Sequence, residues 1–295
     1  MVTEYGIEEK NAVYFEPYWM NYTNIQKLNS QEFKRFTGVH KSTFNRMLKA
    51  WEEYHISQSN AGRPSKLNRA EQLLVALQYW REYRTYFHIA QEWEISEATV
   101  CRIVHRVETV LLQSGRFRIP GKKHLLQGFD PPDVILLDVT ETPIERPKKR
   151  QKSYYSGKKK QHTFKCQVVA ERDSARIICL FFGEGSRHDF HLFKNSGVRI
   201  HPQTQSLQDS GYQGIKAYHD NSYVPKKKPK NGELTQLERD YNCALSQERI
   251  GIEHINRNLK IFKILSGRYR NRRSRYNLGC NLIASLYNYE LSLAV

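Results

Sequence analysis

Apolar residues in the N-terminal third of the chain recur at the spacing of an α-helix, in which positions three or four residues apart share one face. One such face is formed by Phe44, Met47, Leu48, Trp51 and Tyr54. Ser42 precedes this face and is the expected N-cap of the helix. A second helix is expected to begin at Asn68, because Glu71 follows three residues later as in a capping box. The pattern predicts an all-α region that ends near residue 112.

A break in the helical pattern between residues 86 and 111 indicates a helix-turn-helix. Ile89, Ala90 and Trp93 form a short apolar face before the break, and Ser96 is placed to cap a second helix after it. The residues that this second helix would present to a DNA groove or its phosphates are Glu97, Thr99, Arg102 and Arg106. An ordinary αα-hairpin of a helical bundle gives the same pattern, so the pattern alone leaves both interpretations open.

Beyond residue 112 the hydrophobic pattern changes from helical spacing to short apolar runs. Gly and Pro beside basic residues interrupt residues 113–132, which are predicted to form a linker. The elements expected after it are a strand at 133–139, two strands within 162–184 joined by a polar turn at 172–174, a short helix at 188–196, a strand and Gly-rich turn at 204–215, and a long amphipathic helix at 245–265. The chain is therefore expected to be of the α/β class, mixed α+β, with its helices first.

The charge of the chain indicates what kind of partner it binds. The formal net charge is +17, and it is concentrated in blocks at 146–165, 226–230 and 268–275. The first block holds nine Lys or Arg residues and no acid. A single block of this kind is often only a solvated surface, but three blocks interleaved with Tyr and His favour a nucleic acid as the partner.

Other features exclude several classes of protein. The first 15 residues lack the basic and apolar regions of an export signal, and the longest apolar run, at 177–182, is too short to span a membrane. The five cysteines are scattered and never form a CxxC pair, which argues against a disulfide framework and against a zinc site. We therefore expect a cytoplasmic protein with reduced cysteines and no membrane association.

Three acidic residues accompany apolar segments that are far apart in the chain. Asp138 lies at or near the end of the first predicted strand, and Asp209 follows a later apolar run. Glu253 lies on the predicted C-terminal helix. Ligand sites gather at strand ends in open sheets, so we expect the three carboxylates to converge around divalent cations. Hard oxygen ligands select Mg²⁺ or Mn²⁺, and two such ions can clamp the attacking and leaving oxygens of a phosphodiester.

Each acid also has a simpler interpretation. Asp209 would then hydrogen-bond its own turn, and Glu253 would pair with Arg249 on the helix surface. Asp133 and Glu141 are rivals for the first position, although the former precedes the strand and the latter lies three residues beyond the preferred acid.

The predicted C-terminal helix also carries cations near its acid. Steps of four and seven residues separate Arg249, Glu253 and Lys260, so two phosphate-binding cations would flank a metal ligand on one face. His188 and Asp189 permit two interpretations, a proton shuttle or a helix cap with a local hydrogen bond, and the cap is the commoner arrangement.

The chain contains "LDVTETPIERP", "YYSGKKKQHTFK", "DSGYQG" and "RIGIEHINRNLK". These segments resemble the signature blocks of DDE transposases from bacterial insertion sequences, in the insertion-sequence family five group and its Harbinger-like relatives. The segment at 67–107 likewise resembles the helix-turn-helix domain of that group. The resemblance implies a helical DNA-binding domain at 1–112, a linker at 113–132 and a ribonuclease-H-like catalytic domain at 133–295, with a mixed sheet flanked by helices.

The same resemblance assigns roles to the residues discussed above. The acidic triad would be Asp138, Asp209 and Glu253, which would bind two ions of Mg²⁺ or Mn²⁺. The motif R-x₃-E-x₆-K falls on Arg249, Glu253 and Lys260. The residues of the basic block that we assign to contacts with the DNA backbone are Lys158, Lys159, Lys160 and His162.

The implied function is that of a DNA transposase. It would bind element ends on double-stranded DNA as a homodimer or higher oligomer, in the cytoplasm at the nucleoid, and would catalyse hydrolysis and strand transfer. The alternative is a domesticated helix-turn-helix protein that binds DNA and is no longer catalytic. The presence of all three acids and of both cationic companions favours the enzyme, because DNA binding alone does not require them.

Overall fold

The computed structural model describes residues 21–56, 64–127 and 131–293. The N-terminal residues 1–15, whose composition predicts no export signal, lie outside these ranges, as do residues 128–130 of the predicted linker. No helix in the described ranges is long and apolar enough to cross a membrane. All five cysteines are free, and three of them are buried.

The N-terminal helices pack around one central helix. They are α1 (Tyr22–Lys27), α2 (Ser30–Thr37), α3 (Lys41–Ile56), α4 (Arg69–Glu82), α5 (Tyr86–Glu92) and α6 (Glu97–Gln113). α4 lies at the centre and contacts all the others, and its residues 72–80 are all buried. The predicted capping box at its start is confirmed, since Asn68 and Glu71 each accept a hydrogen bond from the other's backbone N–H at 2.9 Å.

Two N-cap predictions in this region have opposite outcomes. Ser96 caps α6 as predicted, because its Oγ accepts a hydrogen bond from the Thr99 N–H at 3.2 Å. The prediction for Ser42 is wrong, because α3 already begins at Lys41. Gly38 ends α2 in the left-handed conformation, at φ 86°, and the chain enters the next helix within three residues, which leaves Ser42 inside the first turn.

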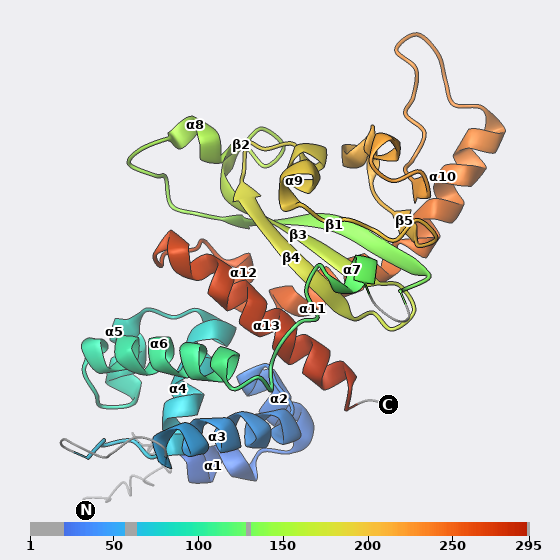
Figure 1. Ribbon diagram of the computed structural model, residues 1–295. Coiled ribbons are helices and arrows are strands. Elements are labelled where there is room, and N and C mark those ends of the chain that lie inside the picture. Colours follow the sequence, from blue (N-terminus) through green and yellow to red (C-terminus); the bar gives the residue numbers. More distant parts are fainter. Residues whose placement is uncertain (1–20, 57–63, 128–130, 294–295) are drawn as a thin grey trace, which may run out of the picture.

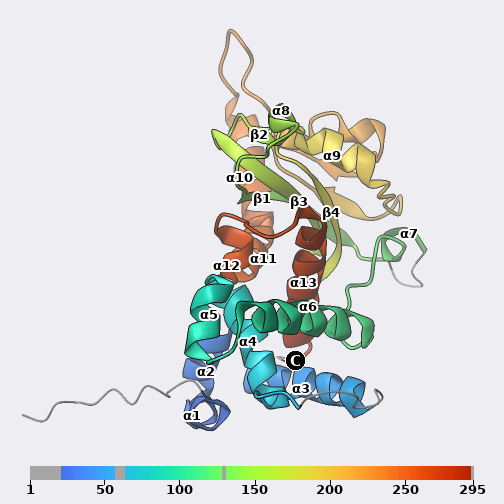
Figure 2. The same cartoon turned by 90° about the vertical axis from the view of Figure 1, so that its left-hand side faces the viewer.

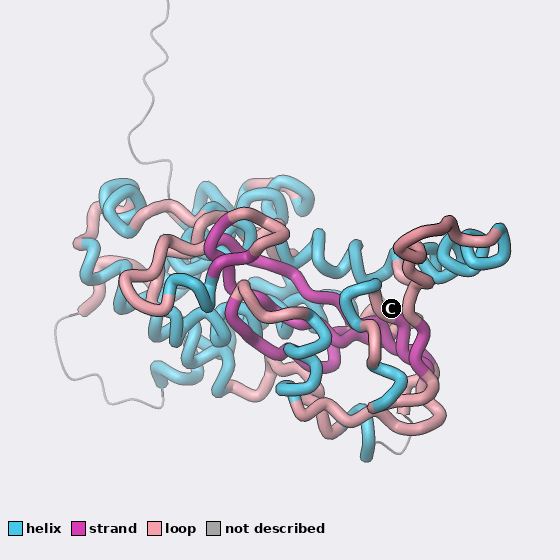
Figure 3. The backbone as a smooth tube through the Cα atoms, turned by 90° about the horizontal axis from the view of Figure 1, so that it is seen from above, coloured by secondary structure: helices cyan, strands magenta, loops and turns pink. Residues whose placement is uncertain are grey.

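A mixed sheet forms the C-terminal half of the chain. Its strands are β1 (Val134–Pro143), β2 (Tyr155–Ser156), β3 (Gln161–Glu171), β4 (Ile177–Glu184), β5 (Gln205–Leu207) and β6 (Ser222–Tyr223). β3 pairs antiparallel with β1 on one side and with β2 and β4 on the other, and β5 and β6 continue the sheet parallel to β1. Figure 3 shows the strands side by side across the molecule. This is the ribonuclease-H-like arrangement that the resemblance implied.

Alternating side chains along the strands divide the core into two layers. In β1, Leu136 belongs to the larger apolar cluster, whereas Ile135 and Leu137 belong to the smaller one. α9 (Asp189–Ser196) packs on β3 and β4 and, in Figure 1, lies above the sheet. α11 (Ile250–Lys260) and α13 (Tyr276–Leu291) lie below it, where they contact β1 and β4 respectively. The remaining elements are α7 (His124–Gln127), α8 (Gln151–Tyr154), α10 (Gln236–Glu248), α12 (Lys263–Ser266), η1 (Ser210–Tyr212), η2 (Ile215–Ala217) and η3 (Arg273–Arg275).

The N-terminal helices are docked on the C-terminal ones. α13 contacts α3 and α6, and α12 contacts α4, as Figure 2 shows from the side. Arg81 donates a hydrogen bond of 2.7 Å to the carbonyl of Ile261, and the Arg275 guanidinium pairs with the buried Glu108 carboxylate. The division of the chain at 1–112, 113–132 and 133–295 stays a prediction.

Two predicted boundaries near the acidic residues are wrong. The long helix at 245–265 is three helices, because the chain bends at Arg249 (φ −89°, ψ −3°) and becomes extended at Phe262 (ψ 106°). α10 buries only Leu245, whereas α11 turns its apolar face to the core. One straight helix would not place the two segments in such different environments. Asp138 lies within β1 and not at its end, because β3 pairs with β1 as far as Pro143.

Candidate active site

Asp138 on β1 and Asp209 just after β5 occupy equivalent positions along two neighbouring parallel strands. The parallel register aligns Leu136 of β1 with Leu207 of β5, and each acid follows two residues later. Burial raises the pKa of Asp138 above its ordinary value, and the negative charge of Asp209 raises it further, while the Arg249 guanidinium opposes the rise. The sheet therefore brings the first two predicted acids together, as the sequence indicated.

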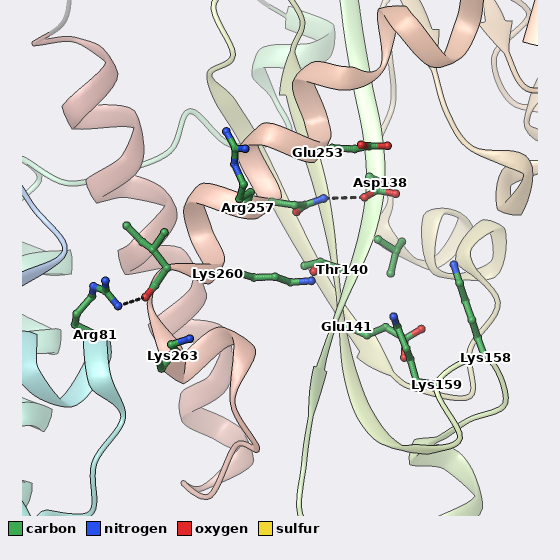
Figure 4. A pocket seen from close by; sticks show the side chains of 13 residues that line it. Arg81, Asp138, Thr140, Glu141, Lys158, Lys159, Glu253, Arg257, Lys260 and Lys263 are labelled. Carbon is green, nitrogen blue, oxygen red and sulfur yellow. Dashed lines mark hydrogen bonds between the residues drawn. The ribbon is translucent and has the colours of Figure 1, made fainter. Parts of the chain in front are cut away.

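Asp209 also has the simpler role that was considered for it. It is the N-cap of η1, and its Oδ1 accepts a hydrogen bond of 2.9 Å from the Gly211 N–H. Glu253, by contrast, has no ion pair with Arg249 within the described residues, and its side chain is exposed. It lines the same pocket as Asp138 (Figure 4).

Asp138, Glu141 and Glu253 line one pocket of about 750 Å³. Several cations line the same pocket, namely Arg81, Lys158, Lys159, Arg257, Lys260 and Lys263. The predicted cations Lys158, Lys159 and Lys260 are therefore gathered around the acids (Figure 4). Burial, and then the charge of Lys159, lowers the pKa of Lys260. Such a pocket provides a cationic rim for phosphate groups and an acidic floor.

Two of the predicted DNA-backbone residues do not line this pocket. Lys160 is exposed at the turn before β3, with φ 54°, and the His162 ring packs edge-on against Tyr155 with centroids 5.6 Å apart. Sequence reasoning missed the pocket cations Arg81, Arg257 and Lys263. Arg81 comes from α4, far away in the sequence, so no local pattern marked it.

Two side chains hold the Asp138 carboxylate. Asn256 Nδ2 donates a hydrogen bond of 2.7 Å to Oδ2, and Arg249 Nη2 lies 3.7 Å from Oδ1. Arg249 was predicted to bind phosphate from the same helix as Glu253 and Lys260. It lies instead at the junction of α10 and α11, directed at Asp138. Sequence reasoning did not single out Asn256, although it lies one helical turn after Glu253.

The rival acids lie in other environments. Asp133 precedes β1 and is exposed. Glu141 lines the pocket, but its Oε2 accepts a hydrogen bond of 2.7 Å from Thr163. α9 begins directly after His188, whose side chain makes no capping hydrogen bond, so the local hydrogen bond expected there is not formed. Asp189 lies 2.7 Å from the buried Lys165 ammonium group instead.

The helix-turn-helix forms a second basic pocket, of about 600 Å³. Its cationic lining residues are Lys66, Arg69, Arg102 and Arg106, and Thr99 lies among them at the start of α6. Burial, followed by the positive charges of Arg69 and Arg106, lowers the pKa of the neighbouring His55 to about 4. The predicted residues Thr99, Arg102 and Arg106 thus share one positively charged surface.

The donor atoms in and beside the first pocket fit a hard divalent cation. Asp138 and Glu253 line the pocket, whereas Asp209 is not among its lining residues and lies after the neighbouring strand β5. All three supply carboxylate oxygens, the ligand type that Mg²⁺ and Mn²⁺ prefer. Asn256 adds a buried Oδ1 atom that has no hydrogen-bond partner among the described residues. Over the same part of the chain, no three His, Cys, Asp or Glu side chains already form a cluster that could bind a metal. The fit therefore rests on the chemistry of the donors and not on a preformed cage.

The ribonuclease-H-like sheet, the acids on and just after two adjacent strands, and the surrounding cations together define an enzyme class that acts on nucleic-acid phosphodiesters. Two family models match the chain: "DDE superfamily endonuclease" over residues 137–288, and "Helix-turn-helix of DDE superfamily endonuclease" over residues 65–117. The chain therefore belongs to the DDE superfamily endonucleases and has an N-terminal helix-turn-helix domain. It is also 46% identical, over 274 residues, to a "Probable transposase for insertion sequence element IS702" of Microchaete diplosiphon, covering 93% of this chain and 99% of that protein.

Membership of this family decides between the two interpretations of residues 86–111. The segment is a helix-turn-helix and not an unrelated αα-hairpin, because the second family model spans both α5 and α6. The helix-turn-helix points to DNA as the partner.

Proposed function

We propose that this chain is a DNA transposase of an insertion sequence. Its helix-turn-helix would bind the element ends, and its acidic pocket would cut the DNA and join the cut end to a target. The single observation that carries the proposal is that Asp138 and Glu253 share one pocket with Lys158, Lys159 and Lys260. We find no support for the alternative, a domesticated protein that only binds DNA.

Asp138, Asp209 and Glu253 would hold two divalent ions, Mg²⁺ or Mn²⁺. When bound, such ions increase the nucleophilicity of the attacking oxygen and stabilise negative charge on the leaving oxygen. DDE superfamily endonucleases generally use divalent ions, which supports the presence of a metal; the choice of ion and the number of two are our proposal.

The chain's own residues orient the reacting groups. Asn256 and Arg249 fix the Asp138 carboxylate, which keeps its oxygens directed at the pocket. Lys158, Lys159 and Lys260 would bind phosphates on either side of the scissile bond. Hydrolysis and strand transfer are both in-line displacements at phosphorus, with water as the nucleophile in the first step and a DNA 3′-hydroxyl in the second, so one pocket serves both.

Thr99, Arg102 and Arg106 at the second pocket would contact the DNA at the element ends. Two ends must be processed together, so we further propose that two or more copies of the chain assemble on DNA, at the bacterial nucleoid in the cytoplasm. Light scattering of the protein with and without end DNA measures this stoichiometry.

The test of the catalytic proposal uses duplex DNA that carries the ends of the element encoding this chain. We expect Mg²⁺-dependent nicking that EDTA abolishes and that Asp138→Asn reduces by at least about a thousandfold, while DNA binding persists. Asp133→Asn is the matched control, because that acid is exposed five residues earlier in the same segment and is expected to leave nicking unchanged. Undiminished nicking by Asp138→Asn contradicts the assignment, and binding without nicking by the unmodified chain favours the inactive alternative.

A further inference from the structure

A fourth carboxylate, that of Asp189 at the start of α9, lies beside the acids of the proposed site. Its Oδ2 lies 2.8 Å from the position that a Cβ atom on Gly211 would occupy, and Asp209 Oδ1 lies 2.9 Å from the same position. The two carboxylates therefore flank one point next to Gly211.

The buried Tyr212 hydroxyl lies near the same acids. Burial, and then the negative charges of Asp138, Asp189 and Asp209, in that order, raise its pKa well above the ordinary value. Tyr212 is fully buried and donates a hydrogen bond of 3.2 Å to Gln167 Oε1. The direction of this pKa shift agrees with the position of Asp189 beside Asp209 that the Gly211 geometry gives.

A buried cation holds Asp189 in this place. Lys165 Nζ lies 2.7 Å from Asp189 Oδ1, donates a hydrogen bond of 2.6 Å to the Arg187 carbonyl, and lies 3.9 Å from Glu141 Oε1. The Lys165 side chain is only 9% exposed. Burying an ion pair contributes little to folding compared with apolar side chains of the same size, so fold stability alone is a weak reason for this pair.

A second buried polar atom lies next to Asp138, on α11, which packs on the other layer of the sheet. Asn256 Oδ1 has no hydrogen-bond partner among the described residues, and Asn256, at 8% exposure, lines the pocket beside Asp138. A buried acceptor without a partner costs free energy unless a ligand satisfies it. Asn256 Oδ1 is therefore a further oxygen acceptor, next to Asp138, that has no partner among the described residues.

We propose that Asp189 is an additional acidic residue of the divalent-cation site, with Oδ1 fixed by Lys165 and Oδ2 presented beside Asp209. Lys165 is then a positioning residue: it neutralises part of the acidic charge and sets the orientation of the carboxylate. This inference rests on the proposed function, because it concerns the same cations, and it adds to the site a residue from α9.

The test measures binding of Mn²⁺ alone to the purified full chain, from the electron paramagnetic resonance signal of the free ion. We expect Asp189→Asn to weaken Mn²⁺ binding about tenfold or more. Because that variant leaves Lys165 buried opposite a neutral group, the double variant Lys165→Gln with Asp189→Asn is measured as well, and we expect the same weakening. Asp220→Asn is the matched control, since this exposed acid precedes β6 at the other end of the parallel strands.

The double variant separates a binding role from a structural one. It removes both charges together, so an unchanged Mn²⁺ affinity in a folded double variant overturns the inference and leaves the pair a structural feature. Asp138→Asn, measured in parallel, tests the proposed function separately. Weaker binding by Asp138→Asn with no change in the double variant refutes only the role of Asp189, whereas unchanged binding by Asp138→Asn refutes the proposed cation site itself.

Discussion

The ion pair between Glu108 and Arg275 allows a quantitative test of how the N-terminal helices are held. Glu108 belongs to α6 and Arg275 to η3, and their side chains are only 5% and 19% exposed. Burial raises the pKa of Glu108, and the Arg275 guanidinium opposes that rise. Replacing Arg275 with Met keeps most of the side-chain volume but leaves a buried carboxylate without its cation.

The expected cost follows from that burial. Removal of one partner from a buried ion pair destabilises proteins by about 3–5 kcal/mol. Arg275 is partly exposed, so we expect the lower end, about 3 kcal/mol at pH 7. The sign of the pH dependence is also fixed. Without Arg275 the pKa of Glu108 rises further, so the carboxylate takes up a proton as the pH falls. The deficit is therefore largest where the carboxylate stays ionised, and it shrinks as the pH falls through the raised pKa, above the ordinary pKa of Glu.

Urea unfolding followed by circular dichroism measures this effect at pH 7 and in mild acid. The matched control is Arg172→Met, which breaks an ion pair of 2.8 Å with Glu248 whose partners are 35% and 52% exposed, and which we expect to cost less than about 1 kcal/mol. Adding Glu108→Gln to Arg275→Met removes the unpaired charge and is expected to restore most of the lost stability. A loss no larger than that of the control, or a deficit that grows in acid, refutes the reasoning.

Two further predictions concern the acidic site and the helix-turn-helix. Gly211→Ala introduces a Cβ atom less than 3 Å from carboxylate oxygens of Asp189 and Asp209, so we expect Mg²⁺-dependent nicking to fall about tenfold to a hundredfold. Gly157→Ala is the control, because its Cβ atom would meet no other atom within 4 Å, and equal activity of the two variants contradicts the prediction. Arg102→Ala is expected to weaken binding to every duplex sequence and to lower the slope of log affinity against log salt by about one, measured by filter binding, and an unchanged slope excludes a phosphate contact.

Local chemistry in the sequence was sufficient to predict several elements. The capping box at Asn68 and the cap at Ser96 each depend on residues within three positions, and both are present in the structure. The strand pair on either side of the turn at 172–174 was predictable because the apolar runs are long and the turn is polar. The proximity of Asp138 and Asp209 was also predictable. Each acid closely follows an apolar run, and parallel pairing of the two strands places such acids at the same edge of the sheet.

The features that the sequence did not predict depend on contacts between segments that are far apart in the chain. β1 extends as far as Pro143 because β3 pairs with it over that length. The residues after Asp138 are mostly polar, so their pattern did not predict that the strand continues. The bend at Arg249 accompanies a change in burial: α11 packs an apolar face against β1, whereas α10 buries only Leu245. The sequence predicted either a proton shuttle or a helix cap at His188 and Asp189, and it did not predict the ion pair of Asp189, because the partner Lys165 lies 24 residues earlier.

The same kind of distant contact connects the two pockets. α4 lies against α6, which carries the basic surface of the helix-turn-helix, and against α12, which follows directly on α11. Its residue Arg81 lines the acidic pocket and donates a hydrogen bond to Ile261, the residue that ends α11. α11 in turn supplies Glu253 and Asn256 to that pocket. One buried helix therefore contacts both the DNA-binding helices and the end of the helix that carries the third acid, and the two pockets belong to a single packed unit.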